Sequence, residues 1–196
     1  MARPAKFDRE QVLEKMMLIF WERGYACTSL SDILAATGLK KGSLYHSFGN
    51  KEKLFRLALS RYSVRGPAFM GKPGPSLDSL VFIYSKLVDD AAVPELRRRA
   101  CLVFNSGLEF GTARGPMARA MRGELGKLEN FFRAIIGRAV AAGDLPRDLD
   151  QPAAAARIFS AAFTLREIAR FRPERRFLLE IANAALASLG TKRRIK

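Results

Sequence analysis

Apolar residues recur along the chain at spacings of three and four positions, and no stretch alternates apolar and polar residues as a strand would. This period is typical of amphipathic helices. Ser, Asp or Asn before such a pattern and Gly after it mark the helix ends. The pattern predicts nine helices, which cover approximately residues 9–23, 30–37, 40–48, 51–62, 77–92, 94–113, 116–142, 150–163 and 173–189.

The second and third predicted helices are short and close together. Thr28 and Ser29 are residue types that cap helix N-termini, and Gly38 can take the left-handed conformation of a tight turn. The helix that follows has Leu44 and Phe48 four residues apart, on one buried face. Two short helices around a Gly-containing turn predict a helix-turn-helix, whose second helix enters the DNA major groove. The alternative is a solvated helical hairpin in an ordinary bundle.

The residue identities in this segment indicate its function more specifically than its periodicity does. The run Gly42-Ser43-Leu44-Tyr45-His46, followed by Phe48 and Lys51-Glu52, resembles the DNA-binding domain of TetR-family transcriptional regulators. The resemblance extends without gaps from about Phe7 to Tyr62. Within the TetR family, the sequence is similar to the AcrR-like branch. It implies an all-α, nine-helix TetR-like fold, with a three-helix DNA-binding domain before a helical C-terminal domain. The residues that it assigns to the DNA surface are Thr28, Ser29, Lys40, Lys41, Gly42, Ser43, Tyr45, His46 and Lys51.

The chain departs from the family pattern at the start of the recognition helix. Lys40 stands where the family usually has serine. A capping hydroxyl is thereby replaced by a positive charge, which favours phosphate contact over capping. Leu34 and Thr37 stand where small alanines are usual, so we expect slightly more open packing between the two helices.

Composition shifts divide the chain into segments. Residues 65–76 are rich in Gly and Pro, which indicates a boundary rather than a continuing helix. We expect a DNA-binding domain at 1–63, with its helix-turn-helix at about 29–48, a boundary at 64–76 and a ligand-binding and dimerisation domain at 77–190. The basic residues 191–196 are expected to form a disordered, solvated tail.

Charge and composition agree with a cytoplasmic DNA-binding protein. The formal net charge is +15, and both the first 66 residues, with 12 basic against 6 acidic residues, and the remainder, with 22 against 13, carry a surplus. The excess is therefore not confined to the DNA-binding segment. No apolar run is long enough to span a membrane, and the N-terminus lacks the apolar stretch of a signal peptide. The chain has two cysteines, which argues against a disulfide framework.

No catalytic constellation can be assembled from these residues. The chain has a single histidine, His46, which lies on the predicted recognition helix. With it, Cys27 and Cys101 cannot form a recognisable zinc site, and no glycine-rich phosphate loop follows a strand. We therefore expect no enzymatic activity, no metal and no cofactor.

The last two predicted helices contain many alanines, with Leu178, Ile181, Ala185 and Leu189 on one stripe of the ninth. The resemblance implies that these two helices pair with their copies in a homodimer. A two-fold dimer suits a palindromic operator, because it places two recognition helices about one DNA turn apart. The alternative is that these helices pack only within the monomer.

The resemblance also implies a repressor that a small-molecule inducer releases from its operator, with the signal passing through the fourth helix. The residues that we expect around this ligand are Cys101, Phe104, Asn105, Leu108, Leu128, Phe132, Phe163 and Arg166. Two alternatives stay open: a redox- or electrophile-responsive regulator acting through Cys101, which follows three arginines, and a DNA binder without a ligand switch. Activation of transcription is also compatible with the sequence, since the sequence does not encode the position of the operator. It also does not encode the regulated genes or the inducer.

Overall fold

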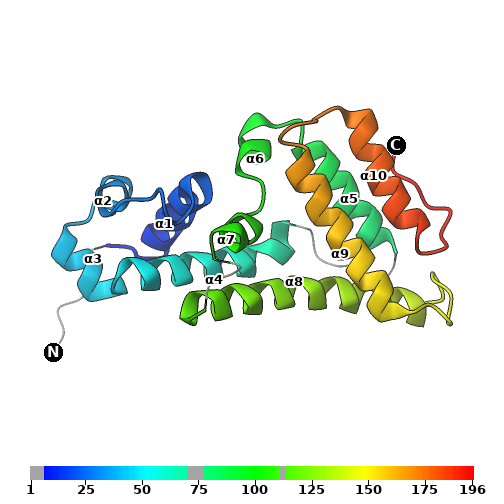
Figure 1. Cartoon of the computed structure of the whole chain (residues 1–196), viewed down its shortest axis with the longest axis horizontal. Coiled ribbons are helices and arrows are strands. Elements are labelled where there is room, and N and C mark those ends of the chain that lie inside the picture. Colours follow the sequence, from blue (N-terminus) through cyan, green and yellow to red (C-terminus); the bar gives the residue numbers. More distant parts are fainter. Residues whose placement is uncertain (1–6, 70–76, 111–113) are drawn as a thin grey trace. The chain divides into compact units, whose positions relative to one another are not determined.

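Every regular element in the described part of the chain, residues 7–69, 77–110 and 114–196 of the computed structural model, is an α-helix (Figure 1). The predicted all-α class is therefore confirmed. The helices are α1 (Arg9–Arg23), α2 (Leu30–Thr37), α3 (Lys41–Phe48), α4 (Lys51–Phe69), α5 (Asp78–Asp90), α6 (Pro94–Arg99), α7 (Leu102–Phe110), α8 (Pro116–Ala141), α9 (Gln151–Ile168) and α10 (Arg175–Ala187).

Most helices begin where the capping residues predict. The Asp8 side chain accepts hydrogen bonds from two backbone N–H groups of the first turn of α1, at 2.8 and 3.2 Å. Asn50 accepts from the N–H of Lys53 in α4 at 2.9 Å, and Asp150 from that of Ala153 in α9 at 3.1 Å. Each side chain thus satisfies donors that a helix N-terminus leaves open.

Helix α4 is longer than we expected. The Gly/Pro-rich stretch from Arg65 predicts an end near Tyr62, but the helix runs to Phe69 and includes Gly66 and Pro67. The helix continues although both are poor formers of a helix interior, and nothing in its sequence explains this extension. The rest of the expected boundary, residues 70–76 with the predicted cap Ser76, lies outside the described residues.

The predicted sixth helix is divided into α6 and α7 at Ala100. The φ angle of Ala100 is 48°, a conformation that residues other than glycine rarely adopt. Burial holds it there: Ala100 is 0% exposed, and the N–H of the next residue, Cys101, donates to a carboxylate oxygen of Glu167 in α9 at 3.3 Å. No Gly or Pro marks this break, so it was not predicted. The expected end of this segment, near Ala113, lies outside the described residues.

The chain forms two packing units. The first comprises Met1–Val64 and Leu102–Glu124, and the second Arg65–Cys101 and Leu125–Lys196. Helix α7 therefore packs with the N-terminal helices, although it follows α5 and α6 in the sequence. The expected C-terminal domain, residues 77–190, is not a single packing unit.

Aromatic rings hold α1 and α4 of the first unit together. The ring of Phe20 in α1 meets that of Phe55 in α4 edge to face at 5.0 Å between centroids, and Trp21 meets Tyr62 at the same distance. Such pairs stabilise a core beyond the area that they bury. Arg61 of α4 adds ion pairs to Glu14, at 2.8 Å, and to Glu10 of α1.

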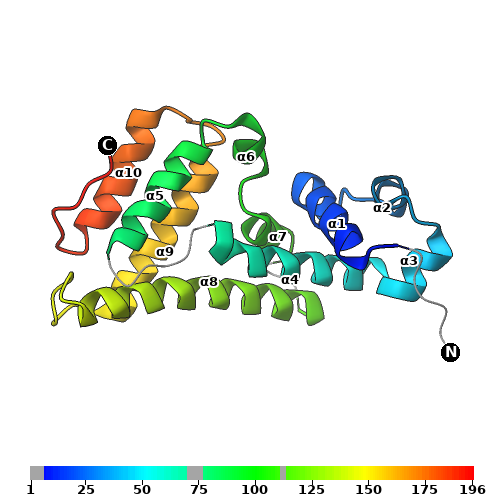
Figure 2. The ribbon, with the colours of Figure 1, turned by 180° about the vertical axis from the view of Figure 1, so that it is seen from behind.

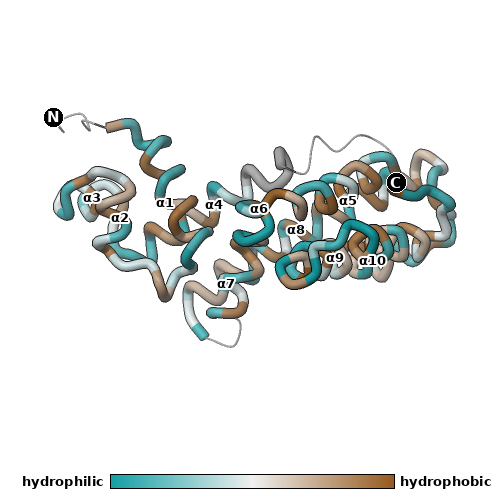
Figure 3. The backbone as a smooth tube through the Cα atoms, turned by 90° about the horizontal axis from the view of Figure 1, so that it is seen from above, coloured by the Kyte–Doolittle hydropathy of each residue, from teal (hydrophilic) through white to brown (hydrophobic). Residues whose placement is uncertain are grey.

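Helices α5, α9 and α10 lie side by side and form the core of the second unit with the later part of α8 (Figure 1). Figure 3 shows hydrophobic positions recurring among hydrophilic ones along α9 and α10. Tyr84 of α5 is 0% exposed, and its hydroxyl donates to the backbone carbonyl of Ile158 in α9 at 2.6 Å. Burial raises the pKa of this phenol above its ordinary value, so it stays protonated and keeps donating.

The C-terminal tail folds back along α10, which Figure 2 shows from behind. Ile195 is 7% exposed and belongs to the core of the second unit. Its N–H donates to the side-chain oxygen of Asn183 at 2.8 Å, and its carbonyl accepts from the Asn183 side-chain amide at 3.1 Å. Our expectation of a disordered tail is therefore wrong, because one apolar residue among the basic ones anchors the segment.

Candidate nucleic-acid interface

A capping box fixes the start of α2. The Ser29 hydroxyl accepts from the backbone N–H of Asp32 at 3.1 Å, and the Asp32 carboxylate accepts from the N–H of Ser29 at 2.8 Å. Hydrogen bonds from Ser29, and secondarily the charge of Arg23 2.6 Å away, hold the pKa of Asp32 below its ordinary value. Asp32 thus stays ionised at the N-terminus of α2, where a negative charge is stabilising.

Gly38 ends α2 in the left-handed conformation, with φ 72° and ψ 11°, as predicted. The chain then turns into α3, whose Leu44 and Phe48 are 0% and 4% exposed. Ile33 of α2 is also fully buried. Burial of these apolar side chains leaves the opposite face of α3 to solvent.

The exposed face of α3 carries polar and basic side chains. Of the residues that the sequence assigns to the DNA surface, those on this helix and just before it are exposed: Lys40, Lys41, Gly42, Ser43, Tyr45 and His46. Lys40 makes no side-chain capping hydrogen bond. A Cβ atom built on Gly42 would meet nothing within 4 Å, so the backbone there borders open space. This part of α3 can approach another backbone closely.

Thr28 does not belong to this surface. Its side chain is 0% exposed, and its hydroxyl donates to the carbonyl of Gly24 at 2.6 Å. The assignment of Thr28 to the DNA surface is therefore wrong, because the hydroxyl closes the turn between α1 and α2. Ser29 remains exposed beside it.

Lys51, the first residue of α4, lies over an aromatic ring. Its ammonium is 4.4 Å from the ring centroid of Tyr25, which is within the range of a cation–π contact. The pKa of Tyr25 is raised by burial and, to a smaller extent, by the charges of Glu52 and Glu109. The phenol therefore remains neutral at physiological pH.

Arg9 contacts the end of the recognition helix, a role that the sequence analysis missed. Its guanidinium donates to the backbone carbonyl of Ser47 at 2.9 Å and lies 4.5 Å above the ring of Phe48. A cation beside the last carbonyls of a helix favours the helix dipole. The residues are 38 positions apart, so no local pattern indicates the contact.

The residues expected around a ligand are not gathered in one unit. Phe104, Asn105 and Leu108 belong to the first unit, whereas the second contains Cys101, Leu128, Phe132, Phe163 and Arg166. Leu108 is 74% exposed, so its assignment to a pocket wall is wrong. Within the second unit, Phe132 and Phe163 both contact Phe159, at 6.1 and 4.6 Å between centroids.

A small cavity of the second unit involves Arg166. It is also lined by Arg97 and Asp90, and its volume of about 10 Å³ is comparable to the space that one water needs. Cys101 is 6% exposed and lies in the break between α6 and α7. Cys27 is exposed. Burial favours a structural role for Cys101, because reactive thiols are at least partly exposed.

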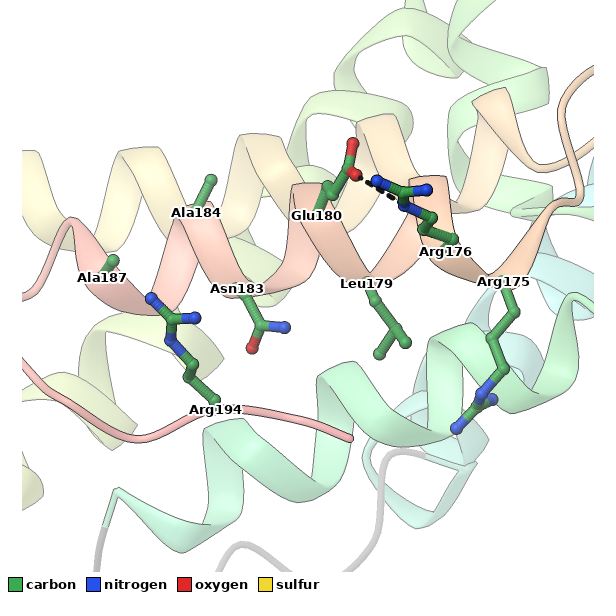
Figure 4. Close-up of a pocket in the computed structure, with 8 residues that line it drawn as sticks. All are labelled: Arg175, Arg176, Leu179, Glu180, Asn183, Ala184, Ala187 and Arg194. Carbon is green, nitrogen blue, oxygen red and sulfur yellow. Dashed lines mark ion pairs between the residues drawn. The ribbon is translucent and has the colours of Figure 1, made fainter.

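A shallow groove of about 620 Å³ runs between the outer face of α10 and the tail (Figure 4). Ala184 and Ala187 of α10 line it with Arg194 of the tail. The apolar stripe that we expected at an interface lies on the other side of α10: Ala185 is 7% exposed and packs in the core of its own unit, as do Leu178 and Leu189. That part of the expectation is wrong, because the stripe covers α5 and α9.

Two general findings concern the described residues only. They contain no group of three or more His, Cys, Asp or Glu side chains placed to hold a metal ion. In the same residues, none of the helices has the length and hydropathy needed to cross a membrane.

Two family models match the chain. The model described as "Bacterial regulatory proteins, tetR family" matches residues 13–58, the region of α1 to α4. The model described as "Tetracyclin repressor-like, C-terminal domain" matches residues 77–184. Together they cover more than half of the chain.

Two relatives align with this chain over most of its length. The chain is 30% identical over 152 residues to the HTH-type transcriptional repressor ComR of Escherichia coli K12, which covers 76% of this chain and 72% of ComR. It is 30% identical over 194 residues to the HTH-type transcriptional regulator YezE of Bacillus subtilis 168, which covers 96% of this chain and all of YezE. Both names describe transcriptional regulators, in agreement with our expectation that the chain is not an enzyme.

Solved structures share the fold. A cysteine-substituted form of the TetR family regulator CifR, in a complex with 26-bp operator DNA, superposes with a TM-score of 0.74 at 30% identity and covers 95% of this chain and 99% of its own. A TetR family regulator from Cytophaga hutchinsonii superposes with a TM-score of 0.80 at 21% identity over 100% and 99% of the two chains. The two family models match the chain in order, and the first one covers the helix-turn-helix of α2 and α3. The protein therefore belongs to the TetR family of DNA-binding transcriptional regulators.

Proposed function

We propose that this protein is a repressor that binds a palindromic operator as a homodimer and reads it with α3. The exposed polar face of α3, backed by the buried Leu44 and Phe48, carries the proposal. Side chains on such a face suit phosphate oxygens and base edges. The proposed DNA-binding residues are Ser29, Lys40, Lys41, Gly42, Ser43, Tyr45, His46 and Lys51.

Charge and position assign roles to five of these residues. Lys40 and Lys51 carry charges at the starts of α3 and α4, and we assign them to phosphates. Lys41 and Ser43 lie in the first turn of α3, and we assign them to base edges. Gly42 lies between them in open space and admits the DNA backbone closely.

Homodimerisation through the outer faces of α9 and α10 is the second part of the proposal. Ala156 of α9 and Ala184 and Ala187 of α10 are exposed, and such small side chains let helices approach closely. One helix-turn-helix reads few base pairs, whereas a two-fold dimer places two recognition helices ~34 Å apart on the duplex. A regulator of this kind works where the bacterial chromosome is, in the cytoplasm.

The third part of the proposal is release from the operator by a small molecule held in the C-terminal domain. Support comes from the match of residues 77–184 to the tetracyclin repressor-like domain and from relatives named as repressors. Ligand and operator then exclude each other, because coupling between two sites is reciprocal. The burial of Cys101 disfavours the redox-responsive alternative.

A selection experiment tests this function. The full-length protein is incubated with a pool of random duplexes, and bound DNA is recovered, amplified and sequenced over several rounds. We expect enrichment of a palindrome whose half-sites lie about one helical turn apart. A pool without enriched sequence would contradict operator recognition, and an enriched single half-site would contradict binding as a dimer. A reporter gene placed behind the selected operator then distinguishes repression from activation.

A further inference from the structure

Glu109, near the end of α7, binds the turn that leads into the helix-turn-helix. One carboxylate oxygen accepts from the backbone N–H of Tyr25 at 3.0 Å, and the other accepts from that of Ala26 at 2.7 Å. Phe110 continues the contact: its ring lies 5.1 Å from that of Tyr25 and 5.9 Å from that of Phe55 between centroids. All of these residues belong to the first unit.

The turn between α1 and α2 is shaped for this carboxylate. Gly24 ends α1 with a φ of 76°, and the two N–H groups after it donate to Glu109. A Cβ atom on Gly24 would lie 2.6 Å from the nearer Glu109 oxygen, so a side chain at this position would displace the carboxylate. Hydrogen bonds to a carboxylate are stronger than those to neutral acceptors. Glu109 is therefore a specific acceptor for a turn that ends at Ser29, the cap of α2.

Helix α7 brings Glu109 to this turn. Helix α7 begins at Leu102, directly after Cys101, whose N–H is held by Glu167 of α9. Helix α7 has nine residues, which span ~13 Å and end at the turn.

We propose that Glu109 is a positioning residue that holds the turn between α1 and α2 in place for the helix-turn-helix, so that loss of the Glu109 contact weakens operator binding. The inference rests on the proposed operator recognition by α3. Glu109 itself acts on the backbone of Tyr25 and Ala26 and needs no contact with DNA.

Three variants of the full-length protein test this proposal. Glu109→Ala removes both acceptors, Glu109→Gln keeps one acceptor oxygen without the charge, and Glu95→Ala removes the same charge from an exposed position on α6. The first readout is the amide proton shifts of Tyr25 and Ala26 by NMR. We expect both signals to move upfield in Glu109→Ala, to move less in Glu109→Gln and to stay in place in Glu95→Ala.

The second readout is affinity for the selected operator and for scrambled DNA, measured by fluorescence anisotropy. We expect operator affinity to fall about tenfold in Glu109→Ala, with a smaller loss in Glu109→Gln, because charge-assisted hydrogen bonds are lost. A purely structural role would lower the melting temperature of these variants and leave their affinity at the Glu95→Ala value, which would overturn the inference. Unmoved amide signals would overturn it as well. A wild-type protein without preference for any operator would instead overturn the proposed function.

Discussion

The ammonium of Lys51 lies 4.4 Å from the centre of the Tyr25 ring, which joins the start of α4 to the turn between α1 and α2. Phe55 and Phe110 meet the same ring edge to face, both at 5.1 Å. The lysine thus lies over a neutral aromatic ring, and this contact leaves its charge uncancelled. This suits a side chain that we assign to a DNA phosphate.

Lys51→Ala should therefore weaken binding to all DNA sequences by a similar factor. A phosphate contact carries no sequence information, and its loss should lower the slope of log K against log salt by about 1. Anisotropy titrations against the selected operator and scrambled DNA at several salt concentrations measure both effects. Arg138→Ala, which removes a charge from an exposed position of α8, is the control. If the affinity and the salt slope of the Lys51 variant were unchanged, Lys51 would not be part of the DNA-binding surface.

Lys41→Ala and Ser43→Ala should change the preference among operators rather than affinity in general. If these side chains meet base edges, each loss should cost about 1 kcal/mol on the preferred operator and less on variants of it. Competition among single-base operator variants gives the preference directly. Ser60→Ala, at an exposed position of α4, serves as the matched control. An equal loss on every operator would reassign both residues to phosphates.

Ala184→Asp should separate the subunits and leave each one folded. Ala184 lies on the exposed face of α10, so in the monomer the new carboxylate is solvated, whereas in the proposed interface it would be buried without a partner. Light scattering and circular dichroism measure mass and helix content. Ala185→Asp is the contrast, since that residue is 7% exposed in the core and an unpaired charge there costs on the order of 3 kcal/mol. A folded dimer in the Ala184 variant would place the interface elsewhere.

The Asp32 carboxylate should stabilise the protein only above acidic pH. Its hydrogen bonds with Ser29, and then the charge of Arg23, lower its pKa in the folded state. A lowered folded pKa means that the contribution is complete above the unfolded pKa, about 3.9, and is lost as the pH falls through the folded value. The melting temperature of Asp32→Asn should therefore lie below that of the wild type at pH 6, with the gap closing below about pH 4.

Asp148→Asn, at an exposed loop position, is the control for that comparison and should show no such gap. A gap between the wild type and Asp32→Asn that persists unchanged to pH 2 would show that the charge of Asp32 does not contribute.

Thiol reactivity should separate the two cysteines. Cys27 is exposed and Cys101 buried, so a colorimetric thiol reagent should react promptly with Cys27 and with Cys101 only after unfolding. Cys27→Ser should abolish the prompt reaction. Release of the wild type from its operator by peroxide or an aldehyde, but not of Cys101→Ser, would instead support the redox-responsive alternative.

Local signals in the sequence determined most helix ends and the helix-turn-helix. Ser29 and Gly38 act through atoms within four residues of themselves, so their roles can be read without the rest of the fold. Burial of Leu44 and Phe48 follows from their spacing on one short helix. The same spacing predicted which residues of α3 remain exposed, since the polar face of an amphipathic helix lies opposite its buried face.

Tertiary structure decided the features that depend on distant partners. Ala100 adopts its positive φ without a Gly or Pro signal, within a buried segment whose next residue is held by Glu167. Thr28 faces inward and Ile195 anchors a basic tail because packing supplies them with neighbours. Glu109 reaches Tyr25 across 84 positions, a contact that α7 makes possible only by packing with the N-terminal helices. Periodicity describes one helix at a time, and the free energy of a long-range contact exists only once two helices have met.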